Sequence, residues 1–202
     1  MANKDQGVYL KPVVRSEMSQ YVDGYGNSRD WKKYNKSLNV SKFESQPNPF
    51  MEMLTFRGLV KSEVPRDPKN STGNASKRKK PGAKQYIRYL VTVRFHNLKF
   101  VDAETKQFSV KSKVAGREQW TRIPTIHNNK AMIKCQCRDF MMTWEKQLAD
   151  NGGLWPNNRW TKYKKVSGSD RPPRNPKDKM GYCKHIQTFL QFLYDSGLIQ
   201  NK

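Results

Sequence analysis

Apolar and polar side chains alternate most regularly along residues 87–95, and this period of two is that of a β-strand with one buried face. Residues 50–60 form a second, mostly apolar segment that also predicts a strand. Leu98 and Phe100 continue the alternation of residues 87–95, a polar turn is expected at 102–106, and residues 107–114 should return as the second strand of an antiparallel hairpin. Shorter extended segments are expected at residues 120–126 and 131–137. These patterns predict a small, mainly antiparallel sheet.

The period changes to that of a helix after residue 138. Asp139 is a favourable N-cap, and the helix that it starts should end at Gly152 and Gly153. The residues expected on its buried face are Phe140, Met141, Trp144 and Leu148. A last helix is expected over residues 184–196, with Gly197 after it, and its core residues would be Ile186, Phe189, Leu190 and Leu193. The chain is therefore predicted to be an α+β protein.

The segments outside these elements are polar and carry turn residues. Residues 1–49 show neither period and predict an extended arm that carries scattered aromatic residues, Tyr21, Tyr25, Trp31, Tyr34 and Phe43. Such an arm cannot bury enough surface to fold alone, so it covers its own domain or docks on a partner. Residues 50–202 are expected to form one domain, which contains a basic loop at 61–84 and a basic insert at 152–182.

Charge points to a polyanionic partner. The 202 residues include 39 Lys and Arg against 17 Asp and Glu, for a net charge of +22. Nucleic acid is the first expectation, ahead of an acidic protein surface, and a merely solvated basic surface is the alternative. The candidate nucleic-acid contacts lie in the two basic segments, at Lys77, Arg78, Lys79, Lys80, Arg159, Trp160, Lys162, Tyr163, Lys164 and Lys165. In the second group, the aromatic rings could stack on bases while the cations meet phosphates.

The sequence predicts no membrane partner, since no run approaches the roughly 18 apolar residues of a membrane helix and no early segment is typical of a signal peptide. We expect a reducing compartment in which thiols stay available for metal.

All three cysteines and one histidine fall in two close pairs, Cys135 with Cys137 and Cys183 with His185. Three thiolates and one imidazole are the four ligands that a closed tetrahedral Zn²⁺ site requires. Alternate residues of a strand share one face, so the first pair can bind one ion from a single extended segment or from a knuckle, and the second pair lies at the start of a helix. The sequence therefore predicts a structural zinc that holds the C-terminal helix to the sheet. His96 and His127 are expected to be ordinary strand and turn residues.

The order Cys-x-Cys followed by Cys-x-His resembles the SWIM zinc finger, which is found in families that include helicases and transposases. The segments 133–140 and 175–185, with the insert between them, are most similar to SWIM-like proteins of tailed phages and related viruses. The resemblance covers residues 130–196. It implies Cys-x-Cys on a β-hairpin, Cys-x-His at a helix start, and binding to DNA or protein.

Three function classes follow from these observations. The first is a non-enzymatic structural component of a tailed-phage virion, assembled in the host cytoplasm, which docks on neighbouring subunits and lies near DNA. The second is a free cytoplasmic accessory or regulatory factor that binds nucleic acid. The third, an enzyme, is disfavoured because the sequence contains no paired carboxylates on a common element, no phosphate-binding glycine loop and no nucleophile triad. We expect the first.

Overall fold

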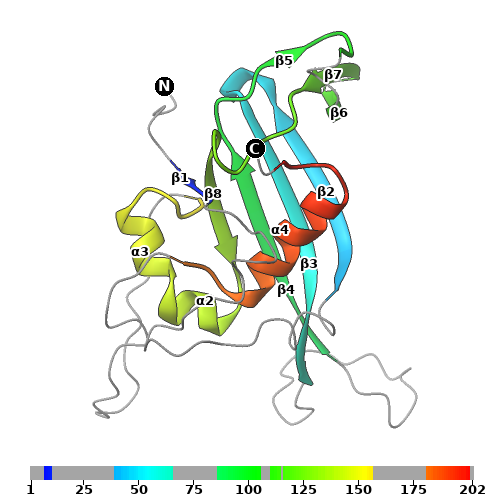
Figure 1. The fold of residues 1–202 in the computed structure, drawn as a ribbon. Coiled ribbons are helices and arrows are strands. Elements are labelled where there is room, and N and C mark those ends of the chain that lie inside the picture. The colour runs from blue at the N-terminus through cyan, green and yellow to red at the C-terminus, as the bar shows by residue number, and fades with distance from the viewer. Residues whose placement is uncertain are drawn as a thin grey trace, which may run out of the picture.

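The structure is a computed structural model, and the residues that it describes are 7–10, 39–65, 86–105, 110–114, 116–156 and 181–200. A twisted sheet forms the centre of the molecule (Figure 1). Helix α4 crosses one face of this sheet, α2 and α3 lie beside its β8 side, and a smaller sheet lies at one end. The chain is therefore a mixed α and β protein with mainly antiparallel pairing, as predicted.

Over the described ranges, the larger sheet has five antiparallel strands in the order β1-β8-β4-β3-β2. Its strands are β1 (Val8–Tyr9), β2 (Val40–Asn48), β3 (Met53–Pro65), β4 (Tyr86–Phe95) and β8 (Lys130–Cys135). The alternation at residues 87–95 becomes β4, at the centre of the sheet. The apolar residues of β4 and β3 lie on the same side of the sheet, because the register places Val91 opposite Gly58 and Val93 opposite Phe56.

Helix α4 (Lys184–Asp195) covers this apolar face. Its buried residues include the four that the sequence assigned to the core, Ile186, Phe189, Leu190 and Leu193. Phe189 lies directly over Gly58, where an added Cβ would come within 2.9 Å of the ring atom Cδ2. Phe43 of β2 extends the contact, since its ring lies 5.5 Å from that of Phe192 and 5.9 Å from that of Phe56, between centroids.

The segment at residues 50–60 begins with a turn before it becomes a strand. Residues Pro49–Met51 form the 3-10 turn η2 at the tip of the β2–β3 hairpin. Asn48 caps this turn, because its side-chain Oδ1 accepts a hydrogen bond from the Met51 N–H at 3.2 Å. The chain then leaves the turn through Glu52, at a positive φ of 51°, and the Glu52 N–H donates to the Pro49 carbonyl.

The smaller sheet contradicts the predicted hairpin, in which the strand that starts at residue 87 continues to Phe100 and pairs with residues 107–114. Its strands are β5 (Phe100–Val101), β6 (Val110–Val114) and β7 (Arg117–Thr121), in the order β5-β7-β6. β7 lies between the two predicted partners, and Thr121 is opposite both Phe100 and Val110. Local alternation located β6, but β7 lies mostly before the segment predicted at 120–126. The pairing could not be predicted from alternation, because it depends on where the later segment returns.

The single helix predicted after residue 138 is divided in two, α2 (Arg138–Thr143) and α3 (Glu145–Asp150), which meet at Trp144. Cys137, not Asp139, is the N-cap of α2. Met141 is exposed, whereas Phe140, Trp144 and Leu148 are buried, as predicted. The last helix ends as predicted, with Gly197 at a φ of 69°.

Two parts of the predicted arm belong to the sheet. Val40–Asn48 is the strand β2, and β1 pairs with β8 through Val8 opposite Ala131. Leu10 is buried. An arm that ends at residue 49 is therefore wrong, because an edge strand gains its hydrogen bonds from β3 without needing an apolar period of its own. Residues 11–38 lie outside the described residues, as do 66–85, which hold most of the predicted basic loop; its first residues continue β3.

Candidate metal centre

Three structural elements bring the four predicted ligands together. Cys135 is the last residue of β8, and Cys137 follows as the N-cap of α2. Cys183 is the N-cap of α4, and His185 lies in the first turn of that helix. All four residues are buried, with at most 3% of each exposed. Strand β8 thus ends between the two cysteines, so the first pair spans a strand-to-helix turn and not one extended segment.

The spacing of the ligand atoms suits a metal ion. The three Sγ atoms and the imidazole nitrogen all lie within 4.8 Å of one another, and the cysteines form no disulfide. A tetrahedral ion with metal–sulfur bonds of about 2.3 Å separates its ligand atoms by roughly 3.8 Å. The residues present therefore fit a four-coordinate metal ion.

The imidazole of His185 gives an independent reason to expect an ion. Among the described residues, neither Nδ1 nor Nε2 has a hydrogen-bond partner, although both are buried. The ring packs against Tyr89 of β4, with centroids 4.8 Å apart, and this contact supplies no partner for a nitrogen. A buried nitrogen without a partner is costly, and coordination would remove that cost.

The thiols interact strongly enough that they cannot all ionise by themselves. Burial raises the pKa of Cys135 and of Cys183 above the usual range of a thiol. Hydrogen bonds from those two side chains hold the pKa of Cys137 well below that range. The cluster therefore favours one thiolate beside two thiols, and a bound cation is what would stabilise three thiolates in this volume.

Backbone N–H groups already point at the sulfur atoms. The Cys137 N–H donates to Cys135 Sγ at 3.4 Å, and the Phe140 N–H donates to Cys137 Sγ at 3.3 Å. The turn between the cysteines is held to the sheet by a 3.2 Å hydrogen bond from the Gln136 N–H to the Leu90 carbonyl. These donors stabilise negative charge on sulfur and fix the direction of both side chains.

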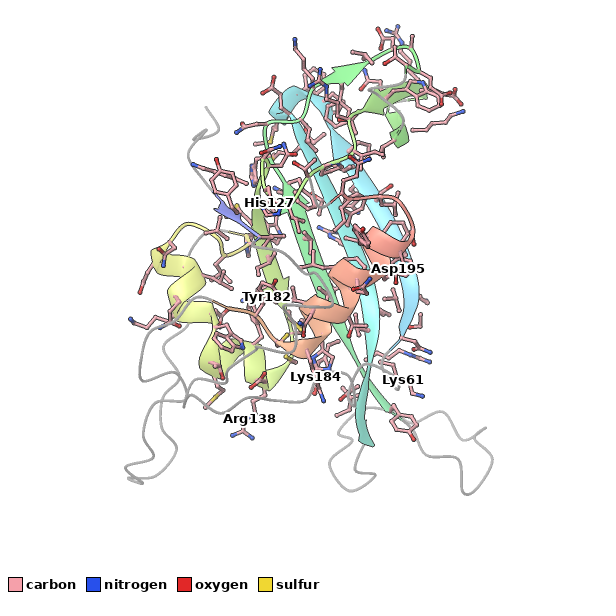
Figure 2. The ribbon with its side chains drawn as sticks, in the orientation of Figure 1. Lys61, His127, Arg138, Tyr182, Lys184 and Asp195 are labelled. Carbon is pink, nitrogen blue, oxygen red and sulfur yellow. The ribbon has the colours of Figure 1, made fainter. Side chains whose placement is uncertain are left out.

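The position of the second ligand pair, Cys183 and His185, depends on Gly181 in the segment 175–185. A Cβ at this position would lie 2.8 Å from Cζ3 of the buried Trp144. The segment that leads to Cys183 therefore passes close against the indole at the α2–α3 junction. Figure 2 shows the helix starts together, with Arg138 of α2 and Lys184 of α4 at the same end of the molecule.

The other predicted site residues are not part of this centre. His96 follows β4, and His127 is exposed in the turn before β8. The ten residues predicted to contact nucleic acid, Lys77, Arg78, Lys79, Lys80, Arg159, Trp160, Lys162, Tyr163, Lys164 and Lys165, lie outside the described residues. Within the described part of the chain, no helix is long and apolar enough to cross a membrane.

Comparisons with known proteins add no assignment: no protein-family model, no curated protein and no solved structure matches the chain. The buried Cys₃His cluster is compatible with a zinc finger on its geometry alone.

Proposed function

We propose that the cluster of Cys135, Cys137, Cys183 and His185 binds one structural Zn²⁺ in a SWIM-like module. Three soft thiolates and an imidazole select zinc over the harder cations Mg²⁺ and Ca²⁺, which prefer oxygen ligands. Four protein ligands complete a tetrahedral shell, so no position remains for a reacting water. The ion would join the end of β8 to the start of α4, and its role is to stabilise the fold.

We further propose that the chain is a non-enzymatic structural component of a tailed-phage virion, where it docks on neighbouring subunits and lies near DNA. The observation that supports docking is the tip of the β2–β3 hairpin. Phe50 is 98% exposed there, and Met51 beside it is 46% exposed.

The tip presents these side chains from a defined backbone. The Asn48 cap and the Glu52-to-Pro49 hydrogen bond close the turn, and the Leu98 N–H donates to the Glu52 carbonyl at 2.9 Å. A large apolar side chain held outside the protein has an unfavourable hydration free energy, and it is the kind of residue that anchors protein interfaces. Because the turn is already formed, docking would cost little ordering entropy. An apolar pocket on another subunit fits this tip.

The experiment is incorporation of Phe50→Ala into particles, measured as copies per purified virion relative to the wild-type chain. The matched control is Tyr194→Ala, since Tyr194 is 50% exposed on α4 and lies outside the hairpin tip. We expect the Phe50 variant to lose most of its incorporation while its zinc content and unfolding midpoint stay unchanged. Absence of the wild-type chain from purified particles would contradict the proposal.

The alternative function is a free nucleic-acid-binding factor of the SWIM type. The net charge of +22 favours it, together with the cations that the sheet itself carries. Stoichiometric presence in particles favours the structural component, whereas early expression and free protein in the host cytoplasm favour the factor.

A further inference from the structure

The face of the larger sheet that points away from α4 carries rows of cationic side chains. Since side chains alternate along a strand, the neighbours of the core residues point to this second face. In the register of the sheet, Lys61 of β3 lies opposite Arg88 of β4. Arg57 lies opposite Thr92, which in turn lies opposite Lys134 of β8. Figure 2 shows Lys61 toward the end of β3 that is remote from the smaller sheet.

Within the part of the chain that the structure describes, seven cations lie on this second face, and we call it the basic face: Lys42, Arg57, Lys61, Arg88, Arg94, Lys130 and Lys134. Two of these cations, Arg57 and Lys134, are paired with carboxylates of described residues. Glu44 lies 3.6 Å from Arg57, and Glu145 pairs with Lys134. Positive charge therefore exceeds negative charge on the basic face, and Lys42 and Arg88 are exposed.

The centre of the basic face is rigid. Arg94 donates from Nε to Thr55 Oγ1 at 2.9 Å, and its guanidinium carbon lies 3.2 Å from the ring centroid of Trp155. Burial, and then the charge of Arg57, lower the pKa of Arg94 to about 10. Arg94 and Arg57 lie on neighbouring strands of the basic face, opposite Thr55 and Thr92, and their like charges repel each other.

Aromatic rings lie among the cations. Tyr86 is 37% exposed at the start of β4, and Lys61 Nζ lies 4.0 Å from its ring centroid. Tyr9 is 52% exposed and lies opposite Lys130, near the other end of the sheet. At about 3.3 Å per residue, the ten residues of β4 span roughly 30 Å between these ends. Cations with exposed rings over such a length suit a flexible polyanion whose bases are free to stack.

We propose that the basic face binds single-stranded nucleic acid, with phosphates on Arg57, Lys61 and Arg88 and bases against Tyr86 and Tyr9. The proposal rests on the part of the proposed function that places the chain near DNA, and it assigns that contact to the sheet itself. An acidic protein would satisfy the cations but would leave the rings without a planar partner. Duplex DNA would offer phosphates but keeps its bases stacked inside.

The test is a fluorescence-anisotropy titration of a mixed-sequence single-stranded DNA of about 15 nucleotides, within the site sizes of single-strand binding domains. Lys61→Gln with Arg88→Gln removes two cations from the basic face. The control, Lys99→Gln with Arg117→Gln, removes two exposed cations at the smaller sheet, and both variants reduce the net charge from +22 to +20. Circular dichroism and zinc content establish that each variant is folded.

We expect the salt slope of log K to fall by about 1.4 in the first variant, or about 0.7 for each lost phosphate contact on a single strand, and to change little in the control. Tyr86→Ala should weaken binding by roughly tenfold without changing the slope, since a stacking contact carries no charge. If Lys61 proves necessary for folding, Lys42→Gln with Arg88→Gln tests the same face, because both side chains are exposed.

Equal losses in the first variant and in the control would overturn the proposal, because net charge alone would then explain binding. Duplex DNA bound more tightly than the single strand would overturn it as well. A wild-type chain that enters particles but does not bind the oligonucleotide would refute the basic face and leave the structural role intact. A wild-type chain that binds the oligonucleotide but never enters particles would refute the structural role and leave the basic face intact.

Discussion

Phe189 of α4 lies so close to Gly58 of β3 that no other amino acid fits at position 58 without a shift. The two residues meet at the centre of the packed face, where Phe189 is fully buried. Glycine here serves a close approach between helix and sheet, since no positive φ is recorded at this residue. The contact and the metal cluster both hold α4 to the sheet, and they can be tested separately.

Gly58→Ala should lower the free energy of unfolding by about 2 kcal/mol, because the new methyl group overpacks a core that has no space for it. The measurement is urea unfolding of the zinc-loaded protein. In a Phe189→Leu background the same substitution should cost less, since the ring that it meets is gone. If Gly58→Ala lowers the free energy of unfolding equally in both backgrounds, the contact between Phe189 and Gly58 is not the cause of the loss.

One equivalent of zinc should copurify with the protein, and Cys183→Ser should abolish it and lower the free energy of unfolding by more than about 4 kcal/mol, as expected for loss of a structural metal. Elemental analysis and circular dichroism measure the two effects. Lys184→Ala is the control, because it lies between the two ligands of the helix and supplies none itself. The site would be refuted by a purified protein that contains no metal and whose helical circular-dichroism signal does not change when a chelator is added.

His96 should make the folded state less stable in mild acid. Burial, and then the charge of Arg94, lower the pKa of His96 from 6.5 to about 4. Between these values the unfolded chain binds a proton that the folded chain does not, so the free energy of unfolding falls as the pH decreases through this window. His96→Gln should weaken this dependence between pH 6.5 and pH 4, measured by urea unfolding. Loss of metal in acid affects both proteins, so the difference between them reports on His96.

Replacing Lys77, Arg78, Lys79 and Lys80 by glutamine should flatten the salt dependence of polyanion binding, by somewhat less than one unit of slope for each phosphate contact removed. The thermal midpoint should stay within about 1 °C of the wild-type value if these side chains carry little packing energy. An unchanged salt slope would indicate that this segment only connects β3 to β4 and does not contact the polyanion. A lower midpoint would instead indicate that the segment packs on the domain.

The amino-acid sequence by itself determined two central elements, β4 and α4, and the chemistry of the metal cluster. The alternation along β4 and the helical period of α4 are short-range properties, so both elements and the buried face of α4 follow from them. The ligand set also follows, because three cysteines and one histidine in two close pairs leave few other arrangements.

Tertiary structure alone decided the pairing of strands and the position of surfaces. β7 separates β5 from β6, and Val40–Asn48 joins the sheet without an apolar period, because hydrogen bonds to a neighbouring strand are available to any sequence. Cys137 caps α2 because its sulfur lies where the Phe140 N–H can donate to it. The basic face likewise depends on register: residues 57, 61, 88 and 134 come together because three strands align, and no local pattern contains that alignment.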